Sequence, residues 1–244
     1  MASLRLDKFI SNQKGLSRSE CRKFILRGAV MVDGKTVRVA DTKIDPELNS
    51  VTIFGEEIGY KEHIYIMMNK PEGLVCANSD KGNKTVIDII PEELKRKNLF
   101  TVGRLDKNTT GLLLITDDGD FAHRVISPKT ETMKKYIAVL DGDVTDDMIF
   151  KFKEGITLAD GTKCLPAKLI KTNEPNVAEV YIVEGKYHQV KRMFGIVGLG
   201  VDKLKRLSIG NLELDSNLRE GECRELKSEE LCKINKFNNK NPQL

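Results

Sequence analysis

One carboxylate, Asp106, stands out in the segment GRLDKNTTG of residues 103–111, which lies between two apolar stretches. A charged side chain close to an apolar core must be paired or used in chemistry, because burying an unpaired charge is costly. Arg104, two residues away, is a candidate partner. An isolated aspartate in a loop is more often a turn former or a surface charge. The segment alone therefore leaves both interpretations open.

Two basic segments indicate a second kind of chemistry, the binding of a polyanion. Residues 1–38 contain nine lysines and arginines and three acidic residues, and residues 186–206 contain six and one. The formal net charge of the whole chain is only +4, so these segments are local concentrations of positive charge. Either segment alone is typical of a solvated surface, but the two together favour contact with a polyanion.

The composition of the chain is that of a soluble globular protein. Its 244 residues are 40% hydrophobic and 31% charged, enough for one large domain or two of ordinary size. No stretch is apolar for long enough to span a membrane or to act as a secretory signal. The cysteines are odd in number and form no CxxC pair, and the three histidines are scattered. We therefore expect free thiols, no metal site and a cytoplasmic location.

The N-terminal basic segment is predicted to form two short helices and a hairpin. Apolar residues in 6–10 have the spacing of one helix face. Ser17 and Glu20 have the pattern of a capping box, in which each side chain accepts a hydrogen bond from the other residue's amide. An Asp-Gly pair within residues 30–37 predicts a tight hairpin turn. The helix after Ser17 has one basic side, interrupted by Leu26 and formed by Arg18, Arg22, Lys23 and Arg27.

The rest of the chain is predicted to be a larger domain with many strands and few helices. A polar, glycine-bearing stretch indicates that the boundary between the two domains lies near residues 55–63. Apolar residues at i, i+3, i+4 and i+7 in 190–197 predict one helix whose stripe belongs to a core. This mixture favours an α+β fold with a largely antiparallel sheet. Strand-like apolar runs occur at residues 64–68, 111–116, 136–140 and 178–183.

Several ordered motifs resemble known RNA-modifying proteins. The strings LDKF at 6–9, SRSE at 17–20 and GAVMVDGK at 28–35 resemble the S4 RNA-binding domain. Further motifs resemble the RsuA-type pseudouridine synthases, which carry an S4 domain before the catalytic domain. These are NKPEG at 69–73, GRLDKNTTGL at 103–112, Lys134-x-Tyr136, EGKYHQVKRM at 184–193 and a closing motif at 201–210. Together the resemblance covers residues 4 to 231.

The resemblance implies an α+β fold with two domains and a tail. A small N-terminal S4-like αα-hairpin domain is expected at residues 1–60. A pseudouridine synthase domain with a mixed, mostly antiparallel central sheet flanked by helices is expected at residues 61–232. Residues 233–244 are polar and are expected to form a frayed tail.

The resemblance also implies which residues act. Asp106 takes the role of the reacting carboxylate, Tyr136 that of the active-site tyrosine, and Lys191 that of the cation paired with the aspartate. Many relatives have arginine in place of Lys191, and lysine lacks its bidentate geometry. Arg104 is a second candidate for the pairing. Substrate or RNA contacts are expected at Arg104, Leu204, His188, Gln189, Arg192, Arg18, Arg22, Lys23 and Arg27.

The activity implied is the isomerisation of uridine to pseudouridine in ribosomal RNA. The product is an isomer of the substrate, so the reaction demands no redox or group-carrying cofactor. The string YHQVKRMF at 187–194 most resembles the enzyme for small-subunit 16S RNA. The substrate would be that RNA or a small-subunit assembly intermediate, and the protein a monomer without a membrane partner. The alternatives are a synthase for large-subunit 23S RNA and a non-catalytic S4-type RNA-binding assembly factor.

Overall fold

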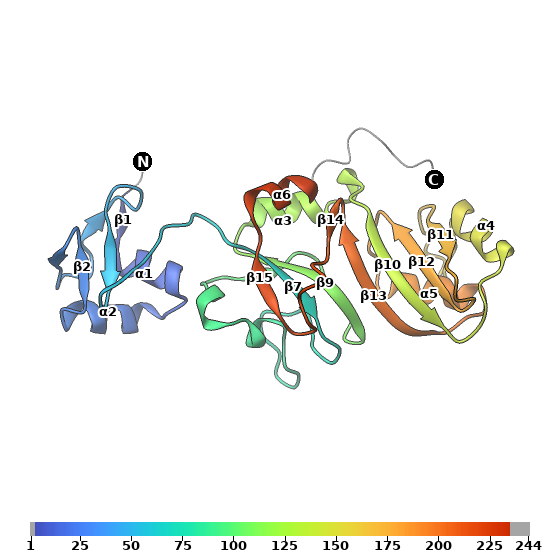
Figure 1. The fold of residues 1–244 in the computed structure, drawn as a ribbon, viewed down its shortest axis with the longest axis horizontal. Helices are drawn as coiled ribbons and strands as arrows, with labels where there is room; N and C mark the ends of the chain where they lie inside the picture. Colours follow the sequence, from blue (N-terminus) through green and yellow to red (C-terminus); the bar gives the residue numbers. More distant parts are fainter. Residues whose placement is uncertain (1–2, 235–244) are drawn as a thin grey trace. The chain divides into compact units, whose positions relative to one another are not determined.

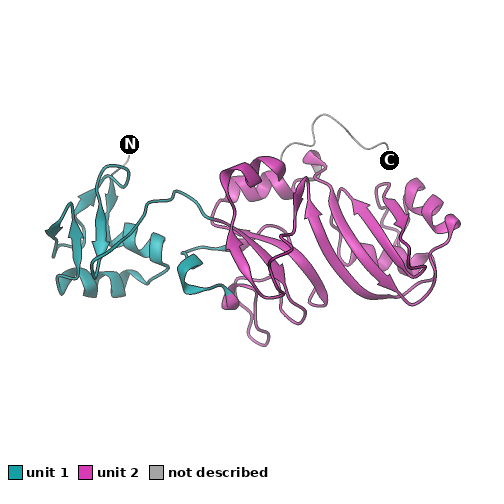
Figure 2. Ribbon diagram, in the orientation of Figure 1, with its two compact units in different colours: residues 1–64, 90–99 teal, residues 65–89, 100–244 magenta. Residues whose placement is uncertain are grey.

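The computed structural model describes residues 3–234 and divides the chain into two compact units (Figure 2). Unit 1 comprises residues 1–64 and 90–99, and unit 2 comprises residues 65–89 and 100–244. The segment 90–99 belongs to unit 1 although the sequence suggests a single boundary near residue 60. Its Arg96 donates hydrogen bonds to the carbonyls of Asn12 and Lys61, at 3.3 and 2.9 Å.

Unit 1 is built around an αα-hairpin of α1 (Leu6–Lys14) and α2 (Arg18–Leu26) (Figure 1). The predicted capping box is present, because the Ser17 side chain accepts from the Glu20 amide and the Glu20 carboxylate accepts from the Ser17 amide. Leu26, which interrupts the basic side of α2, is 63% exposed. The apolar faces of the two helices share one core with the strands, formed by Leu6, Phe9, Ile10, Cys21, Ile25, Val30, Ile44, Val51, Ile53 and Ile58.

The strands of unit 1 are short and form two small sheets. One is an antiparallel pair, β1 (Leu4–Arg5) with β4 (Lys43–Ile44). Asp33 and Gly34 have φ angles of 50° and 73°, as the predicted primed turn between β2 and β3 requires. The other sheet has the order β3-β2-β5-β6, with β2 at Val30–Val32, β3 at Lys35–Thr36, β5 at Val51–Ile53 and β6 at Glu56–Glu57.

Unit 2 is organised on a nine-stranded sheet, in the order β11-β12-β10-β13-β9-β7-β15, with β14 added to β13 and β8 added to β9. Every pairing is antiparallel except that of β13 with β9, so the sheet is mixed and mostly antiparallel, as expected. The bounds are β7 Tyr65–Lys70, β8 Phe100–Thr101, β9 Thr109–Thr116, β10 Lys134–Leu140, β11 Lys168–Lys171, β12 Val177–Ile182, β13 Val201–Ile209, β14 Leu212–Glu213 and β15 Cys223–Glu225.

Helices flank this sheet. The predicted stripe at 190–197 lies on α5 (Gln189–Ile196), where Val190, Met193 and Phe194 are buried. The last helix, α6, reaches Ile234, so the first two residues of the expected tail are helical and the others lie outside the described residues. No helix within residues 3–234 is long and apolar enough to cross a membrane. The other helices of unit 2 are α3 (Gly119–Ile126), α4 (Asp146–Glu154), α6 (Ser228–Ile234) and the short 3-10 turns η1 (Ile87–Ile89) and η3 (Pro128–Thr130), whereas the 3-10 turn η2 (Glu92–Leu94) belongs to unit 1.

The middle of the sheet brings distant parts of the sequence together. Leu204 on β13 is in register with Ala138 on β10 and with Thr109 at the start of β9. Tyr136 precedes Ala138 by two residues and therefore lies on the same face of β10. The loop that carries Asp106 leads directly into Thr109, so these strands place Asp106 beside Tyr136 and Leu204.

Candidate active site

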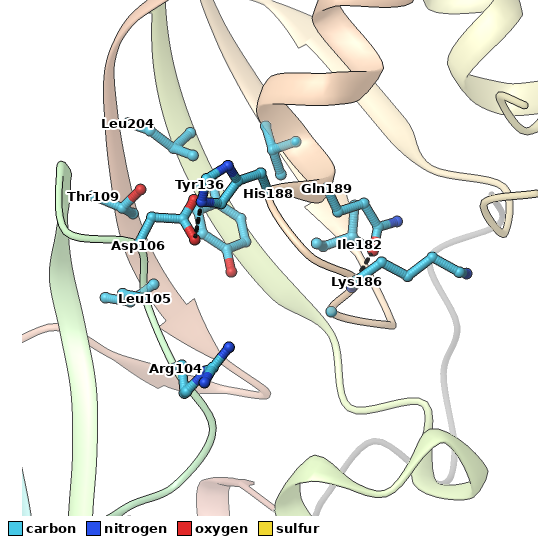
Figure 3. A pocket seen from close by; sticks show the side chains of 12 residues that line it. Arg104, Leu105, Asp106, Thr109, Tyr136, Ile182, Lys186, His188, Gln189 and Leu204 are labelled. Carbon is cyan, nitrogen blue, oxygen red and sulfur yellow. Dashed lines mark hydrogen bonds and ion pairs between the residues drawn. The ribbon is translucent and has the colours of Figure 1, made fainter. Parts of the chain in front are cut away.

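A pocket in unit 2 collects side chains from four strands, two loops and the first turn of α5 (Figure 3). It is lined by Arg104, Leu105, Asp106, Thr109, Tyr136, Ile182, Gly185, Lys186, His188, Gln189, Val190 and Leu204. The structure thus brings together six of the residues that the sequence singles out, namely Arg104, Asp106, Tyr136, His188, Gln189 and Leu204.

A histidine side chain contacts the Asp106 carboxylate. His188 Nε2 lies 3.5 Å from Asp106 Oδ1 (Figure 3), and the two side chains are 41% and 29% exposed. Lys191, the expected partner, is half-buried on α5 and is not among the residues that line the pocket. Within residues 3–234, His188 is therefore the basic side chain that lies at contact distance from the Asp106 carboxylate.

A buried lysine, Lys70, holds the loop that carries Asp106 through hydrogen bonds to backbone carbonyls. Lys70, at the end of β7, is fully buried, and its Nζ donates to the carbonyls of Pro71, Lys107 and Thr109 at 2.9, 3.2 and 3.0 Å. Burial lowers the pKa of Lys70. Three carbonyl acceptors satisfy its ammonium, and two of them, those of Lys107 and Thr109, come shortly after Asp106 in the chain. Lys70 lies in the NKPEG motif, but the sequence alone gives no reason to expect that it supports the Asp106 loop.

Two further cations, the buried Arg206 and the partly buried Lys134, lie on the strands β13 and β10 that also carry the pocket residues Leu204 and Tyr136. Arg206 on β13 is 4% exposed, and its Nε donates to the Leu112 carbonyl at 2.8 Å. Lys134 on β10 donates to the Thr132 carbonyl at 2.8 Å, and burial, together with the nearby charge of Arg206, lowers its pKa to about 8. The Nη2 of Arg206 and the Oγ1 of Thr109 are buried without a hydrogen-bond partner within residues 3–234. Unpartnered polar atoms therefore occur on one lining residue, Thr109, and on Arg206, two residues along β13 from the lining residue Leu204.

The loop before α5 is fixed by its own hydrogen bonds. Gln189 is buried, donates to Glu184 Oε1 at 2.7 Å and accepts from the Lys186 amide at 2.9 Å. Glu184 also accepts from the Leu165 amide at 2.9 Å and forms an ion pair with the Lys186 ammonium. Gln189 thus lines the pocket, but both its side-chain nitrogen and its side-chain oxygen are used in hydrogen bonds that fix the loop.

Two arginines predicted to contact RNA differ in their surroundings. Arg104 is exposed at the edge of the pocket. Arg192 forms an ion pair with Asp160, and its Nη1 donates to the Tyr187 carbonyl at 3.3 Å. Arg192 therefore braces the loop before α5, whereas the side chain of Arg104 is exposed to solvent.

In unit 1 the predicted basic side is organised around a buried carboxylate. Asp7 is fully buried and accepts hydrogen bonds from Arg5, Arg18 and Arg22 at 3.0 to 3.2 Å. Burial alone would raise the pKa of Asp7, but the hydrogen bonds from the three arginines outweigh it and hold that pKa well below its usual range. The arginines outnumber the carboxylate and remain 35%, 42% and 52% exposed. Lys23 and Arg27 are exposed nearby on the chain.

Replacement of Asp7 by asparagine should destabilise unit 1 by about 1–3 kcal/mol at neutral pH, because three charge-assisted hydrogen bonds are weakened. A carboxyl with a depressed pKa contributes stability above its unfolded pKa and loses it as the pH falls. The difference between wild type and Asp7→Asn should therefore shrink as the pH falls below 3.8, the usual value. Urea unfolding at successive pH values measures this difference.

A matched control is Asp41→Asn, because Asp41 is 61% exposed and its ion pair with Arg5 spans 4.0 Å. Exposed pairs of this kind contribute little, so the control should behave as wild type throughout. Equal stability of Asp7→Asn and wild type at neutral pH would contradict the organising role of Asp7.

Comparison with known proteins is consistent with this geometry. A family model described as RNA pseudouridylate synthase matches residues 64–195, and a model of the S4 domain matches residues 4–48. Over 232 residues the chain is 39% identical to the ribosomal small subunit pseudouridine synthase A of Escherichia coli (strain K12), covering 95% of this chain and 100% of the relative.

Two further relatives extend the comparison. The Bacillus subtilis (strain 168) protein named uncharacterized RNA pseudouridine synthase YtzG is 44% identical over 235 residues, covering 95% of this chain and 98% of the relative. A crystal structure of a pseudouridylate synthase, 39% identical in sequence, matches with a TM-score of 0.67 and covers 95% of this chain and 100% of that one. The chain therefore belongs to the RsuA-type RNA pseudouridine synthases, a family of isomerases, and its N-terminal domain is an S4 domain.

Proposed function

We propose that this protein converts one uridine of small-subunit 16S ribosomal RNA to pseudouridine, with Asp106 as the reacting carboxylate. The observation that carries the proposal is the pocket in which Asp106, Tyr136 and Leu204 meet. Support for the small-subunit target comes from relatives named ribosomal small subunit pseudouridine synthase A, one of them 42% identical over 233 residues.

The reaction breaks the bond from C1′ of the ribose to N1 of uracil and forms one from C1′ to C5. The base turns between these steps, C5 loses its proton, and N1 gains one, so atoms and electrons balance without a cofactor. An ionised carboxylate can attack as a nucleophile or stabilise positive charge that develops at C1′. Asp106 is the carboxylate among the residues that line the pocket.

The other pocket residues have complementary roles in this proposal. The ring of Tyr136 packs against the uracil, and its hydroxyl takes part in moving the C5 proton. Leu204 packs against the base from β13. His188 holds Asp106 before RNA binds, and Lys191, on the first turn of α5, adds positive charge beside the pocket. The N-terminus of α5, where His188 occupies the N-cap position without a side-chain capping bond, also carries partial positive charge that attracts anionic groups.

RNA has to be held while the target uridine leaves its stack, because a base inside folded RNA cannot reach Asp106. Flipping a base costs a few kcal/mol, which phosphate contacts can supply. Arg104 at the pocket, and Arg18, Arg22, Lys23 and Arg27 on the S4 domain, are proposed to make these contacts. The substrate is free 16S RNA or an assembly intermediate in the cytoplasm, and the protein acts as a monomer.

Pseudouridine mapping of ribosomal RNA tests this function. RNA from a strain lacking this protein is compared, nucleotide by nucleotide, with RNA from its parent. We expect one pseudouridine of 16S RNA to be missing, with all pseudouridines of 23S RNA retained. Loss of a 23S site instead would overturn the target, and an unchanged map would overturn the proposed function.

A further inference from the structure

An aromatic side chain is exposed next to the pocket and has no role in the chemistry above. Tyr187 is 69% exposed and lies one residue before His188, in the loop that leads into α5. A single exposed aromatic residue is not unusual on a protein surface. The way in which Tyr187 is held makes it different.

Tyr187 forms a stacked pair with the histidine that contacts Asp106. The two ring centroids are 3.9 Å apart and the ring planes are inclined by only 18°. The Nε2 atom at the edge of the same His188 ring lies 3.5 Å from Asp106 Oδ1. The exposed Tyr187 ring is therefore connected by two successive contacts, through His188, to the Asp106 carboxylate in the pocket.

The backbone of His188 adopts an unfavourable conformation in the loop that carries these rings. His188 has φ 48° and ψ 34°, the left-handed conformation that residues other than glycine rarely adopt. Strain of this kind persists where the surroundings impose it, and it concentrates at functional sites. Here the surroundings are the Arg192 bond to the Tyr187 carbonyl and the Gln189 bond to the Lys186 amide. These two hydrogen bonds brace the loop on both sides of Tyr187.

The charges around the pair suit a nucleic acid. Arg104 lines the same pocket as His188, and so does Lys186, whose ammonium forms an ion pair with Glu184. Proteins that bind single-stranded nucleic acid combine positive charge along the backbone path with aromatic rings on which bases stack. An exposed tyrosine backed by a second ring, beside basic residues and a pocket for one flipped base, has this combination.

We propose that the Tyr187–His188 pair is a stacking platform for the nucleobase next to the target uridine. This inference rests on the proposed function. When the uridine leaves its stack for the pocket, its neighbour loses one stacking partner, and the exposed ring of Tyr187 replaces it. The platform contributes to RNA binding and to holding the strand open, and it does not touch the bonds that break or form.

The absence of tryptophan from this chain makes a direct test possible. Tyr187→Trp introduces a single fluorophore at the platform, in an Asp106→Asn background that prevents turnover. Titration with small-subunit ribosomal RNA should quench its fluorescence, because a stacked base quenches tryptophan. The matched control is Phe150→Trp in the same background, at a site on α4 that is 62% exposed, and its fluorescence should remain unchanged.

Substitutions at Tyr187 measure the energetic contribution. Tyr187→Ala and Tyr187→Leu should each raise KM for RNA by about 5- to 150-fold, the range expected for one stacked base. Tyr187→Phe keeps the ring and should stay within about twofold of wild type, with kcat little changed in all three variants. Leucine tests whether apolar bulk alone is enough, as it would be at a protein–protein contact.

The outcomes separate this inference from the proposed function. If Tyr187→Trp is not quenched, or if Tyr187→Ala binds RNA as wild type does, the platform is excluded even when the enzyme is active. Equal KM values for the leucine and phenylalanine variants would also exclude stacking. An inactive wild-type protein whose Tyr187→Trp variant is still quenched by RNA would overturn the activity and leave the platform standing.

Discussion

Asp106→Asn should lower pseudouridine formation by at least about 10³-fold while leaving RNA binding within about threefold of wild type. Asparagine has nearly the same shape as aspartate, but it is neither an anionic nucleophile nor a stabiliser of positive charge at C1′. Formation of the new bond at C5 releases the C5 proton, so tritium released from RNA labelled at C5 of uridine measures the reaction. RNA affinity is measured separately by filter binding.

The control for this substitution is Asp143→Asn, which removes an exposed carboxylate from the loop before α4. It should release tritium at the wild-type rate. Loss of activity in Asp106→Asn with an intact fold separates chemistry from stability, so both variants are also compared in thermal unfolding. A rate for Asp106→Asn close to wild type would remove Asp106 from the mechanism.

Gly111→Ala should lower the free energy of unfolding by about 2–4 kcal/mol and the melting temperature by about 5–15 °C. Gly111 lies on β9 at φ 98°, where β13 runs alongside in parallel. A Cβ added to Gly111 would lie 2.2 Å from the Arg206 carbonyl oxygen and 2.8 Å from its amide nitrogen. Both atoms belong to backbone and cannot swing aside, so β9 and β13 must separate.

The same substitution should reduce activity by more than its effect on stability explains. β9 begins at Thr109, next to the loop of Asp106, and β13 carries Leu204, so their separation displaces the pocket. Differential scanning calorimetry and tritium release measure the two effects. Gly119→Ala is the matched control, because a Cβ at Gly119 meets nothing within 4 Å; it should leave both properties nearly unchanged. Wild-type stability of Gly111→Ala would contradict the close approach of these strands.

The local structure of this chain follows closely from its sequence. The capping box at Ser17 and Glu20, the primed turn at Asp33-Gly34 and the buried stripe of α5 are each written in residues a few positions apart. Short-range hydrogen bonds and helical periodicity determine such features, so both the features and their positions could be predicted from the sequence. The mostly antiparallel sheet also follows from the number of short apolar runs.

The long-range features of the site could not be predicted in the same way. The left-handed backbone of His188 is imposed by hydrogen bonds and stacking within a loop, and no sequence pattern marks it. The family resemblance selects Lys191 as the partner of Asp106, whereas the basic side chain within 3.5 Å of its carboxylate in the structure is His188. The role of Lys70 depends on three carbonyls that only the fold brings within reach.

Domain composition shows a similar limit. The segment 90–99 lies between η1 and β8 in sequence, yet it belongs to the same compact unit as the S4 domain. The signal at the sequence level would have been Arg96, a basic residue whose side chain reaches backbone carbonyls of the N-terminal region. An arginine in a polar segment has many possible partners, so that signal is too weak to act on.

The most direct measurement of the central claim combines genetics with chemistry at one nucleotide. Ribosomal RNA is mapped for pseudouridine in a strain lacking this protein that carries either the wild-type gene or the Asp106→Asn variant, expressed at equal levels. The account predicts that one pseudouridine of 16S RNA is absent from the deletion strain, returns with wild type and stays absent with Asp106→Asn. Its return with the asparagine variant would contradict the account.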